Sequence, residues 1–260
     1  MTGQKSCGHL FDGVPCLHGI IQAGLHGMGR VWLSDEREPR AGVMTCGDVL
    51  ICAGEAEERD IELLRGAVCS DRREWVAWCP GHWRALLSGI RNFRVETRYA
   101  FDPGILPDPR AVRALLDGMP GDLCAVPLKG AWISWCRQHA WSRDFVSCYA
   151  SADEFTAISA GVLLLRDDEP VSGASGYVSY PGGIEVQVQT RDDQQGKGYA
   201  TLASAALLLR CHEKGIRATW DAANAASAAI AAKLGYRQIM PYEALIVPPS
   251  EAGMEEGGKA

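Results

Sequence analysis

The chain lacks any long apolar run. No segment of its 260 residues approaches the ~20 apolar residues that a membrane-spanning helix needs, so we expect no membrane partner. The opening residues, MTGQKSCGHLFDG, also lack the apolar core of a signal peptide. These two absences favour a cytoplasmic protein.

The chain also lacks an excess of positive charge. Its formal net charge is −6, and no basic stripe is present, which argues against nucleic acid as a partner. An acidic protein is compatible with a small cationic substrate, because negative clefts concentrate cations. An apolar content of 47% with 22% charged residues is typical of a folded globular chain.

A recognisable zinc spacing is missing as well. Cys7, His9, Cys16 and His18 form a C-x-H…C-x-H pattern that matches no common zinc finger. The ten cysteines of a cytosolic chain are expected to be reduced and mostly buried. We therefore predict neither a metal site nor a disulfide framework.

What the chain does have is a glycine loop between an alternating strand and an alanine-rich helix. The loop is Gln195–Ala200; Ile184–Thr190 is the predicted strand, and the helix is expected over 200–214. Such an order aims backbone N–H groups and a helix N-terminus at one point, which suits a phosphate or pyrophosphate. A glycine-rich turn without a ligand is the alternative.

Two common phosphate loops do not fit these residues. The dinucleotide fingerprint would need a third glycine at Thr201, and the Walker loop would need Ser or Thr at Gly198. The remaining pattern, Gln-x-x-Gly-x-Ala, is met by Gln195, Gly198 and Ala200. It resembles motif A of the GCN5-related N-acetyltransferase (GNAT) family, in which this loop holds the pyrophosphate of acetyl-CoA.

The segment that follows strengthens this resemblance. Gly215 is a plausible helix stop, 216–220 alternates as a strand, and Asn224 with Ser227 predicts a helix start. Asn224 through Lys233-Leu234-Gly235-Tyr236 resembles motif B of the same family. Both motifs occur in the family's order, so we expect its fold.

The expected fold class is mixed α/β, with a central mixed sheet and flanking helices. We predict an acetyl-CoA-binding domain over 121–248 and a flexible tail over 249–260. Residues 1–120 are expected to form an N-terminal α/β lobe, which carries no second cofactor motif and is a candidate for a degenerate copy of the fold. Strands and helices predicted from apolar patterns are 30–33, 48–52, 75–79, 83–90, 96–101, 161–166 and 171–180.

The resemblance implies acetyl-CoA as co-substrate and assigns residues to it. In the family, the strand before the loop pairs through its backbone with the pantetheine arm, and the motif B asparagine contacts that arm. The residues carried over are Val188, Gln189, Thr190, Gln195, Gly196, Lys197, Gly198, Tyr199, Ala200, Thr201, Asn224 and Ser227.

Two carboxylates are the candidate catalytic residues. On the predicted strand Ile184, Val186 and Val188 share one face and Glu185 lies on the other, which we expect to face the cleft. Family members often use a glutamate on this strand as general base; the alternative for Glu185 is a solvated strand face. Asp221 could act as base, bind a substrate ammonium group or cap the next helix. Many members carry a tyrosine acid seven residues after the motif B asparagine, where this chain has Ala231.

The acceptor is predicted from a narrower resemblance. Segments such as Gly29-Arg30-Val31-Trp32 and Trp141-Ser142-Arg143-Asp144-Phe145 are similar to the zwittermicin-resistance branch of the family, and most to its kasugamycin-acetylating enzymes. This implies N-acetylation of an aminoglycoside-type antibiotic, with kasugamycin favoured, by direct transfer in a ternary complex. Substrate contacts are assigned to Trp141, Asp144, Trp220 and Asp221, although core packing would also explain the aromatic residues.

Other functions stay open from the sequence. The acceptor could be a metabolic amine or a protein N-terminus, and Ala231 leaves room for a noncatalytic CoA-binding protein. A homodimer is also open.

Overall fold

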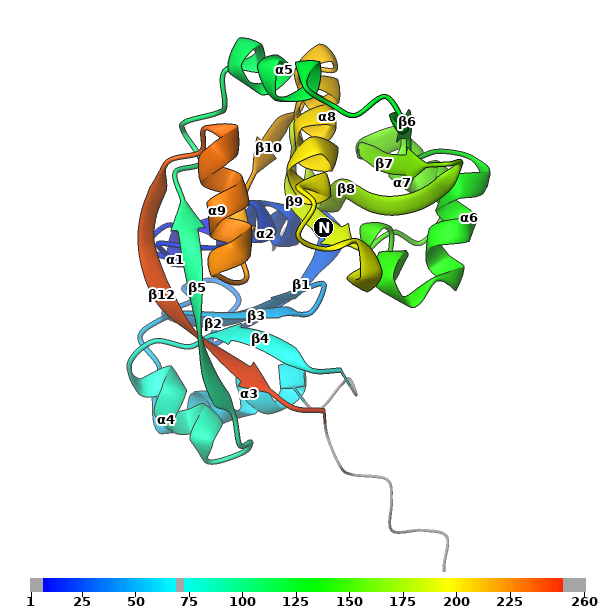
Figure 1. Cartoon of the computed structure of the whole chain (residues 1–260). Coiled ribbons are helices and arrows are strands. Elements are labelled where there is room, and N and C mark those ends of the chain that lie inside the picture. The colour runs from blue at the N-terminus through cyan, green and yellow to red at the C-terminus, as the bar shows by residue number, and fades with distance from the viewer. Residues whose placement is uncertain (1–6, 69–72, 250–260) are drawn as a thin grey trace, which may run out of the picture. The chain divides into compact units, whose positions relative to one another are not determined.

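Two compact units share the chain. The structure is a computed structural model that describes residues 7–68 and 73–249 (Figure 1). Unit 1 is formed by the described residues of segments 1–14, 29–97 and 243–260, and unit 2 by segments 15–28 and 98–242. Strands β5 and β12 contribute residues to both units.

Unit 1 holds the first strands of a seven-stranded mixed sheet with strand order β1-β2-β3-β4-β12-β5-β11. β3 and β4 pair in parallel, and the other neighbours from β1 to β12 are antiparallel. β2 is buried along its whole length: Ala41 and Val43 pack in a core cluster with residues of α3 and α4, and Leu10 of α1 lies against Gly42. Elements with residues in this unit are α1 (Gly8–Phe11), β1 (Gly29–Leu33), β2 (Ala41–Cys46), β3 (Val49–Gly54), η2 (Glu58–Asp60), α3 (Ile61–Val68), β4 (Trp75–Trp78), α4 (His82–Ser88), β5 (Arg94–Phe101) and β12 (Gln238–Val247).

Unit 2 is built on a second mixed sheet with strand order β10-β9-β8-β7-β6. Only the β9–β10 pair in this sheet is parallel. The strands of this sheet are β6 (Leu123–Pro127), β7 (Gly161–Arg166), β8 (Glu169–Tyr180), β9 (Gly183–Thr190) and β10 (Arg217–Thr219). The two-residue strand β11 (Asp221–Ala222) also belongs to this unit but pairs with β5. The helices of the unit are α2 (His18–Ala23), η1 (Gly24–Met28), α5 (Pro109–Asp117), α6 (Ala131–Gln138), η3 (Ala140–Phe145), α7 (Ala152–Ile158), η4 (Asp192–Gln194), α8 (Tyr199–Glu213) and α9 (Ala225–Leu234).

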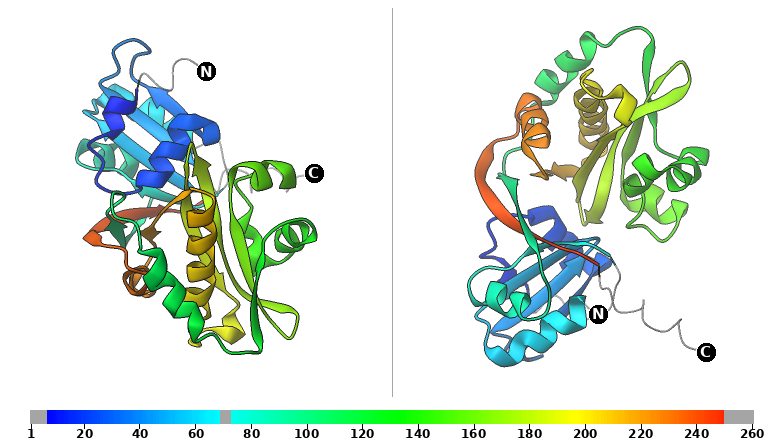
Figure 2. Two further views of the ribbon diagram at one scale, coloured as in Figure 1. Left: turned by 90° about the horizontal axis from the view of Figure 1, so that it is seen from above. Right: turned by 60° about the horizontal axis from the view of Figure 1, so that its bottom comes forward.

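Helices cover both faces of the unit 2 sheet. α8 lies against β7, β8 and β9 (Figure 2), where Ile184 and Val186 join its apolar side chains in one core cluster. The alternate side chains Leu163 and Leu165 of β7 pack on the other face against α6, η3 and α7. α2 contacts β8 and β9, and since Glu185 points away from the α8 face, its carboxyl meets α2. The predicted alternation along β9 is confirmed.

The predicted fold class is confirmed, since both units combine a mixed sheet with flanking helices. The predicted strands and helices appear with ends shifted by a few residues. Four strands were not predicted: β2, β6, β11 and β12. β2 carries Gly42 and Thr45 within a fully buried run, so it shows no alternation from which a strand could be predicted.

The units are discontinuous in sequence, which differs from the predicted division at residue 120. Segments 15–28 and 98–120 lie in unit 2 with the glycine loop, whereas 243–248 lies in unit 1. A division by sequence position cannot capture a chain that crosses between units four times, at 14/15, 28/29, 97/98 and 242/243. Apart from residue 249, the predicted tail lies outside the described residues.

Candidate active site

The site begins where two parallel strands separate. β9 and β10 pair from Gly183 with Arg217 to Glu185 with Thr219. Beyond that point the chain turns away, and Asp221 in β11 pairs instead with Ala100 of β5. Within the part of the chain that the structure describes, the β9 edge over 186–190 therefore has no strand neighbour on that side. Its backbone N–H and C=O groups can bind an extended ligand.

The three residues predicted to pair with pantetheine lie on this edge. Val188, Gln189 and Thr190 are half-buried at the end of β9. Thr190 also exchanges a hydrogen bond of 2.8 Å with the Ser172 hydroxyl of β8, which fixes the strand end. β9 is thus paired with β8 on one side, while the backbone groups on its other side are open to a ligand.

The glycine loop follows at once and is exposed. Gly196 and Gly198 have φ of 78° and 80°, in the left-handed region that favours glycine. Gly198 is the N-cap of α8 and has no side chain to satisfy the first N–H groups of the helix. These N–H groups and the positive end of the helix dipole remain available to an anion, which is the arrangement a pyrophosphate requires.

The other loop residues shape this cradle. Lys197 Nζ donates to Gln194 Oε1 at 2.7 Å and lies 5.9 Å from the ring centroid of Tyr199, and Gln195 Nε2 donates to Asp192 Oδ1 at 3.0 Å. Tyr199 is buried, and Ala200 and Thr201 form the first turn of α8.

Motif B forms the second helix as predicted. Asn224 is the N-cap of α9, and its side chain accepts a hydrogen bond of 2.9 Å from the Ser227 N–H. The Ser227 hydroxyl in turn accepts from Trp220 Nε1 at 3.2 Å. Trp220 is 4% exposed within the core cluster beside Tyr236, an environment that favours a packing role over a substrate contact. Ala231 is fully buried in the same cluster.

Glu185 is buried at the point where the strands separate. It is 4% exposed, so the solvated alternative does not hold. One carboxyl oxygen, Oε2, accepts a hydrogen bond of 2.6 Å from Thr219 Oγ1, and the other, Oε1, has no partner among the described residues. Burial raises the pKa of Glu185 to about 8, and the Thr219 hydrogen bond opposes the rise. A carboxyl with this pKa and a free oxygen can accept a proton near neutral pH.

Asp221 is buried too, but its carboxylate is fully engaged. Arg98 donates to Oδ1 from Nε at 3.0 Å and from Nη2 at 2.9 Å, and the Tyr242 hydroxyl donates at 2.8 Å. The backbone N–H of Leu17 is a further donor. Burial raises the pKa of Asp221, and the Arg98 charge opposes this. Asp221 does not cap α9, since Asn224 occupies that position.

The predicted substrate residues of the helical segment lie apart from this pair in sequence and packing. Trp141 is half-buried in η3, with its ring 6.0 Å from Trp135 and 5.9 Å from Phe145. Asp144 is exposed on the same short helix. Trp141 thus packs in an aromatic cluster under the sheet, whereas Asp144 is open to solvent.

Five residues of the site were not predicted: Leu17, Gly19, Arg98, Thr219 and Tyr242. Each contacts Glu185 or Asp221 from a distant part of the sequence. Thr219 could have been found from the sequence. Its strand and the strand of Glu185 were both predicted, and parallel pairing of the two in this register puts the Thr219 hydroxyl opposite Glu185. For the other four residues, only the tertiary structure gives the signal.

No metal centre and no membrane segment are seen in residues 7–68 and 73–249. They hold no group of three or more His, Cys, Asp or Glu residues suited to a metal ion, and no helix there is long and apolar enough to cross a bilayer. The Cys7 and His9 pair belongs to unit 1, whereas Cys16 and His18 belong to unit 2.

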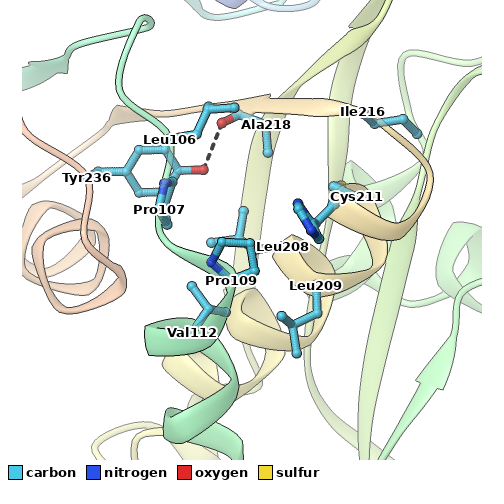
Figure 3. A pocket seen from close by; sticks show the side chains of 11 residues that line it. Leu106, Pro107, Pro109, Val112, Leu208, Leu209, Cys211, Ile216, Ala218 and Tyr236 are labelled. Atoms are coloured by element: carbon cyan, nitrogen blue, oxygen red, sulfur yellow. Dashed lines mark hydrogen bonds between the residues drawn. The ribbon is translucent and has the colours of Figure 1, made fainter.

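A mostly apolar pocket in unit 2 lies at the other end of α8. Leu208, Leu209 and Cys211 line it together with Pro109 and Tyr236, whose hydroxyl donates to the Ala218 carbonyl at 2.8 Å (Figure 3). Leu208 is about 15 Å along the helix from the glycine loop, at about 1.5 Å per residue. The pocket is therefore separate from the phosphate cradle.

Comparison with known proteins agrees with this geometry. The family model of GNAT acetyltransferases matches residues 9–245. The chain belongs to the GNAT acetyltransferase family. A GCN5-related N-acetyltransferase-like protein from Streptococcus suis 89/1591 has 27% identity and a TM-score of 0.80 over 94% of this chain and 98% of that one. A GCN5-related N-acetyltransferase from Kribbella flavida, at 16% identity and a TM-score of 0.54, covers 96% of this chain and 97% of its own and shares the fold. No curated protein matches the sequence.

GNAT proteins generally bind acetyl-CoA, and the residues present fit that ligand. The open edge of β9 suits the two amides of the pantetheine arm, and the Gly196–Gly198 loop with the start of α8 suits the pyrophosphate. A side chain at Gly198 would need the strained left-handed backbone that glycine adopts freely.

Proposed function

We propose that this GNAT protein transfers the acetyl group of acetyl-CoA to an amino group of a small cationic antibiotic of the aminoglycoside type, with kasugamycin favoured. Glu185 carries the proposal: a buried carboxyl with one free oxygen stands beside the open edge of β9. The acceptor class rests on the resemblance of the chain to antibiotic-acetylating GNAT enzymes and on the net charge of −6.

The chemistry requires a base, an oxygen-binding donor and a path for the thiol. Bound acetyl-CoA supplies an acetyl thioester, which an unprotonated amine converts to an amide with release of the thiol. Glu185 in its ionised form takes the proton that the ammonium group must lose. The backbone N–H groups of β9 over 188–190 point alternately to β8 and to the open edge, and one on the open edge would donate to the thioester oxygen.

Of the two predicted catalytic carboxylates, the contacts favour Glu185 as the base. Its Oε1 has no hydrogen-bond partner among the described residues, and its pKa is raised. Asp221 accepts hydrogen bonds from Arg98, Tyr242 and Leu17, so its lone pairs are occupied. Protonation of Asp221 would also remove the carboxylate charge that balances the buried Arg98 guanidinium.

The general acid for the departing thiol remains unassigned on α9. That helix carries no tyrosine, and its fully buried Ala231 occupies the position where many GNAT members have one. We propose that the thiol leaves as a thiolate and takes its proton from solvent.

The test is thiol release from acetyl-CoA with a panel of amines. The panel should hold kasugamycin, other aminoglycosides, a diamine and a peptide with a free N-terminus, with each product identified by mass spectrometry. We expect turnover with an aminoglycoside, and its loss in Glu185→Gln. Turnover only with the diamine or the peptide would overturn the acceptor class. Acetyl-CoA binding without turnover on any amine would leave a noncatalytic CoA-binding protein.

A further inference from the structure

Gly19 on α2 lies directly against the Glu185 carboxyl. A Cβ at this position would come within 2.2 Å of Glu185 Oε2 and 2.3 Å of Thr219 Oγ1, distances that real Cβ atoms do not reach. The φ of Gly19 does not lie in the left-handed region, so the backbone conformation does not demand glycine here. The close approach of α2 to the carboxyl favours it, because any Cβ would require the carboxyl, the Thr219 hydroxyl or α2 to shift.

The turn that starts α2 is strained and held in place. Leu17, the residue before the helix, adopts φ 59° and ψ 30°, a left-handed conformation that costs a non-glycine residue about 1 kcal/mol or more. Leu17 is 2% exposed, and its N–H is bound by the Asp221 carboxylate. Strain of this kind persists only where the surroundings fix the backbone.

Asp221 joins this turn to Glu185. Its side chain holds Leu17 and is itself locked by Arg98 and Tyr242, while its own backbone N–H donates to the Glu185 carboxyl. One aspartate thus connects the start of α2, β11 and the candidate base.

We propose that Gly19 and Asp221 are positioning residues for Glu185: Asp221 anchors the Leu17 turn, and the anchored α2 seals one side of the Glu185 carboxyl against water through Gly19. The catalytic part of this inference rests on the proposed function, since a raised pKa of the Glu185 carboxyl matters to the reaction only if Glu185 is its base. The seal itself is a property of the folded chain that can be measured without turnover.

The charged groups around Glu185 have opposite effects on its pKa. The Asp221 charge raises the pKa of Glu185 and the Arg98 charge lowers it, whereas burial is the largest cause of the rise. Since those two charges oppose each other, exclusion of water by α2 and its neighbours has the larger effect. Other titratable or charged groups on the elements packed around Glu185 are Tyr180 of β8, Arg217 of β10, His18 of α2, Tyr236 after α9 and Tyr242 of β12.

The first arm of the test introduces a Cβ at the seal. Carbon-13 NMR titration of the Glu185 carboxyl, identified by its loss in Glu185→Gln, is compared in the wild type, Gly19→Ala and the control Gly121→Ala. No atom lies within 4 Å of a Cβ at Gly121. We expect Gly19→Ala to lower the Glu185 pKa by about one unit or more, because either α2 or the Glu185 carboxyl must shift and their dry contact opens to water, and the control to leave it unchanged. An unchanged pKa in a folded Gly19→Ala protein would overturn the inference.

The second arm keeps the inference testable if Gly19→Ala fails to fold. Hydrogen exchange of the 15–28 segment is measured in Asp221→Asn and in Asp102→Asn, an aspartate of unit 2 that also pairs with an arginine, Arg237. Loss of a charged hydrogen-bond acceptor should speed exchange in this segment about ten-fold or more in Asp221→Asn, but not in the control. Equal exchange in both variants would contradict the anchoring role.

Activity gives the last readout and separates the two proposals. In Gly19→Ala the pH profile of kcat/KM should move to lower pH together with the NMR titration. A protein that shows both structural effects but acetylates no amine would overturn the proposed function and leave the positioning of Glu185 intact. If a folded Gly19→Ala protein acetylates an amine with an unchanged pH profile of kcat/KM, the positioning of Glu185 by Gly19 is overturned and the proposed function stands.

Discussion

Replacement of Glu185 by glutamine should change how stability depends on pH. The folded protein holds the Glu185 proton up to a pKa of about 8, whereas the unfolded chain loses it near the ordinary value of 4.5. Between these values the folded state binds one more proton than the unfolded state, so the free energy of unfolding falls as pH rises. Below pH 4.5 Glu185 is protonated in both states and costs no stability. As the pH rises from 4.5 to 8, the free energy of unfolding falls progressively.

The size of this effect follows from the two pKa values. At about 1.36 kcal/mol per pKa unit, the difference corresponds to about 5 kcal/mol, a large part of the 5–15 kcal/mol typical of a folded protein. Glutamine keeps the shape of the side chain and an acceptor for Thr219, but it does not titrate. Glu185→Gln should therefore resemble the wild type in stability near pH 4.5 and exceed it at pH 8 and above.

Urea unfolding followed by circular dichroism between pH 4.5 and 9 measures this difference. The Glu185 charge also raises the pKa of Tyr180 and Tyr236, but both tyrosines ionise above this pH range, so the difference between the two curves isolates Glu185. Glu213→Gln, on the exposed end of α8, is the matched surface control. Parallel curves for the wild type and Glu185→Gln would refute the claim that a dry environment holds this carboxyl protonated.

Three further predictions concern activity, binding and packing. Wild-type kcat/KM should rise with pH to a plateau with an apparent pKa near 8, and a flat profile would contradict this. Glu185→Gln should lower kcat by ~10²–10⁴, with acetyl-CoA affinity little changed. Gly198→Val should abolish acetyl-CoA binding in calorimetry. The control Gly182→Val changes a glycine with a similar positive φ in the β8–β9 turn and should still bind acetyl-CoA. Equal affinities of the two variants would show that the glycine loop does not bind acetyl-CoA. Gly176→Ala should destabilise the protein by about 1–3 kcal/mol in urea unfolding, because its Cβ would lie 2.5 Å from Ser159 Oγ; unchanged stability would show that β8 can shift.

Local patterns sufficed to predict the elements to which the cofactor contacts are assigned. The glycine loop, the α8 helix and the Asn224 cap depend on residues close together in sequence, so turn chemistry and helix capping suffice to find them. The alternation that separates Ile184 and Val186 from Glu185 is likewise local, and the core confirms it.

The surroundings of the candidate base could not be predicted in the same way. Arg98 reaches Asp221 across 123 residues, and Gly19 comes from a short segment that leaves unit 1 and returns to it. A carboxyl on a strand with polar neighbours fits a solvated face as well as a buried one until the covering helix is known. The burial of Glu185 and the engagement of Asp221 are therefore tertiary properties.

The central claim is that an acetyl-CoA-dependent reaction on a small amine uses Glu185 as its base. Thiol release from acetyl-CoA in the presence of kasugamycin, measured from pH 6 to 9 for the wild type and Glu185→Gln, tests it most directly. We predict amine-dependent release that rises with a pKa near 8 in the wild type and is lost in Glu185→Gln. Equal release by the two proteins at every pH would contradict the account.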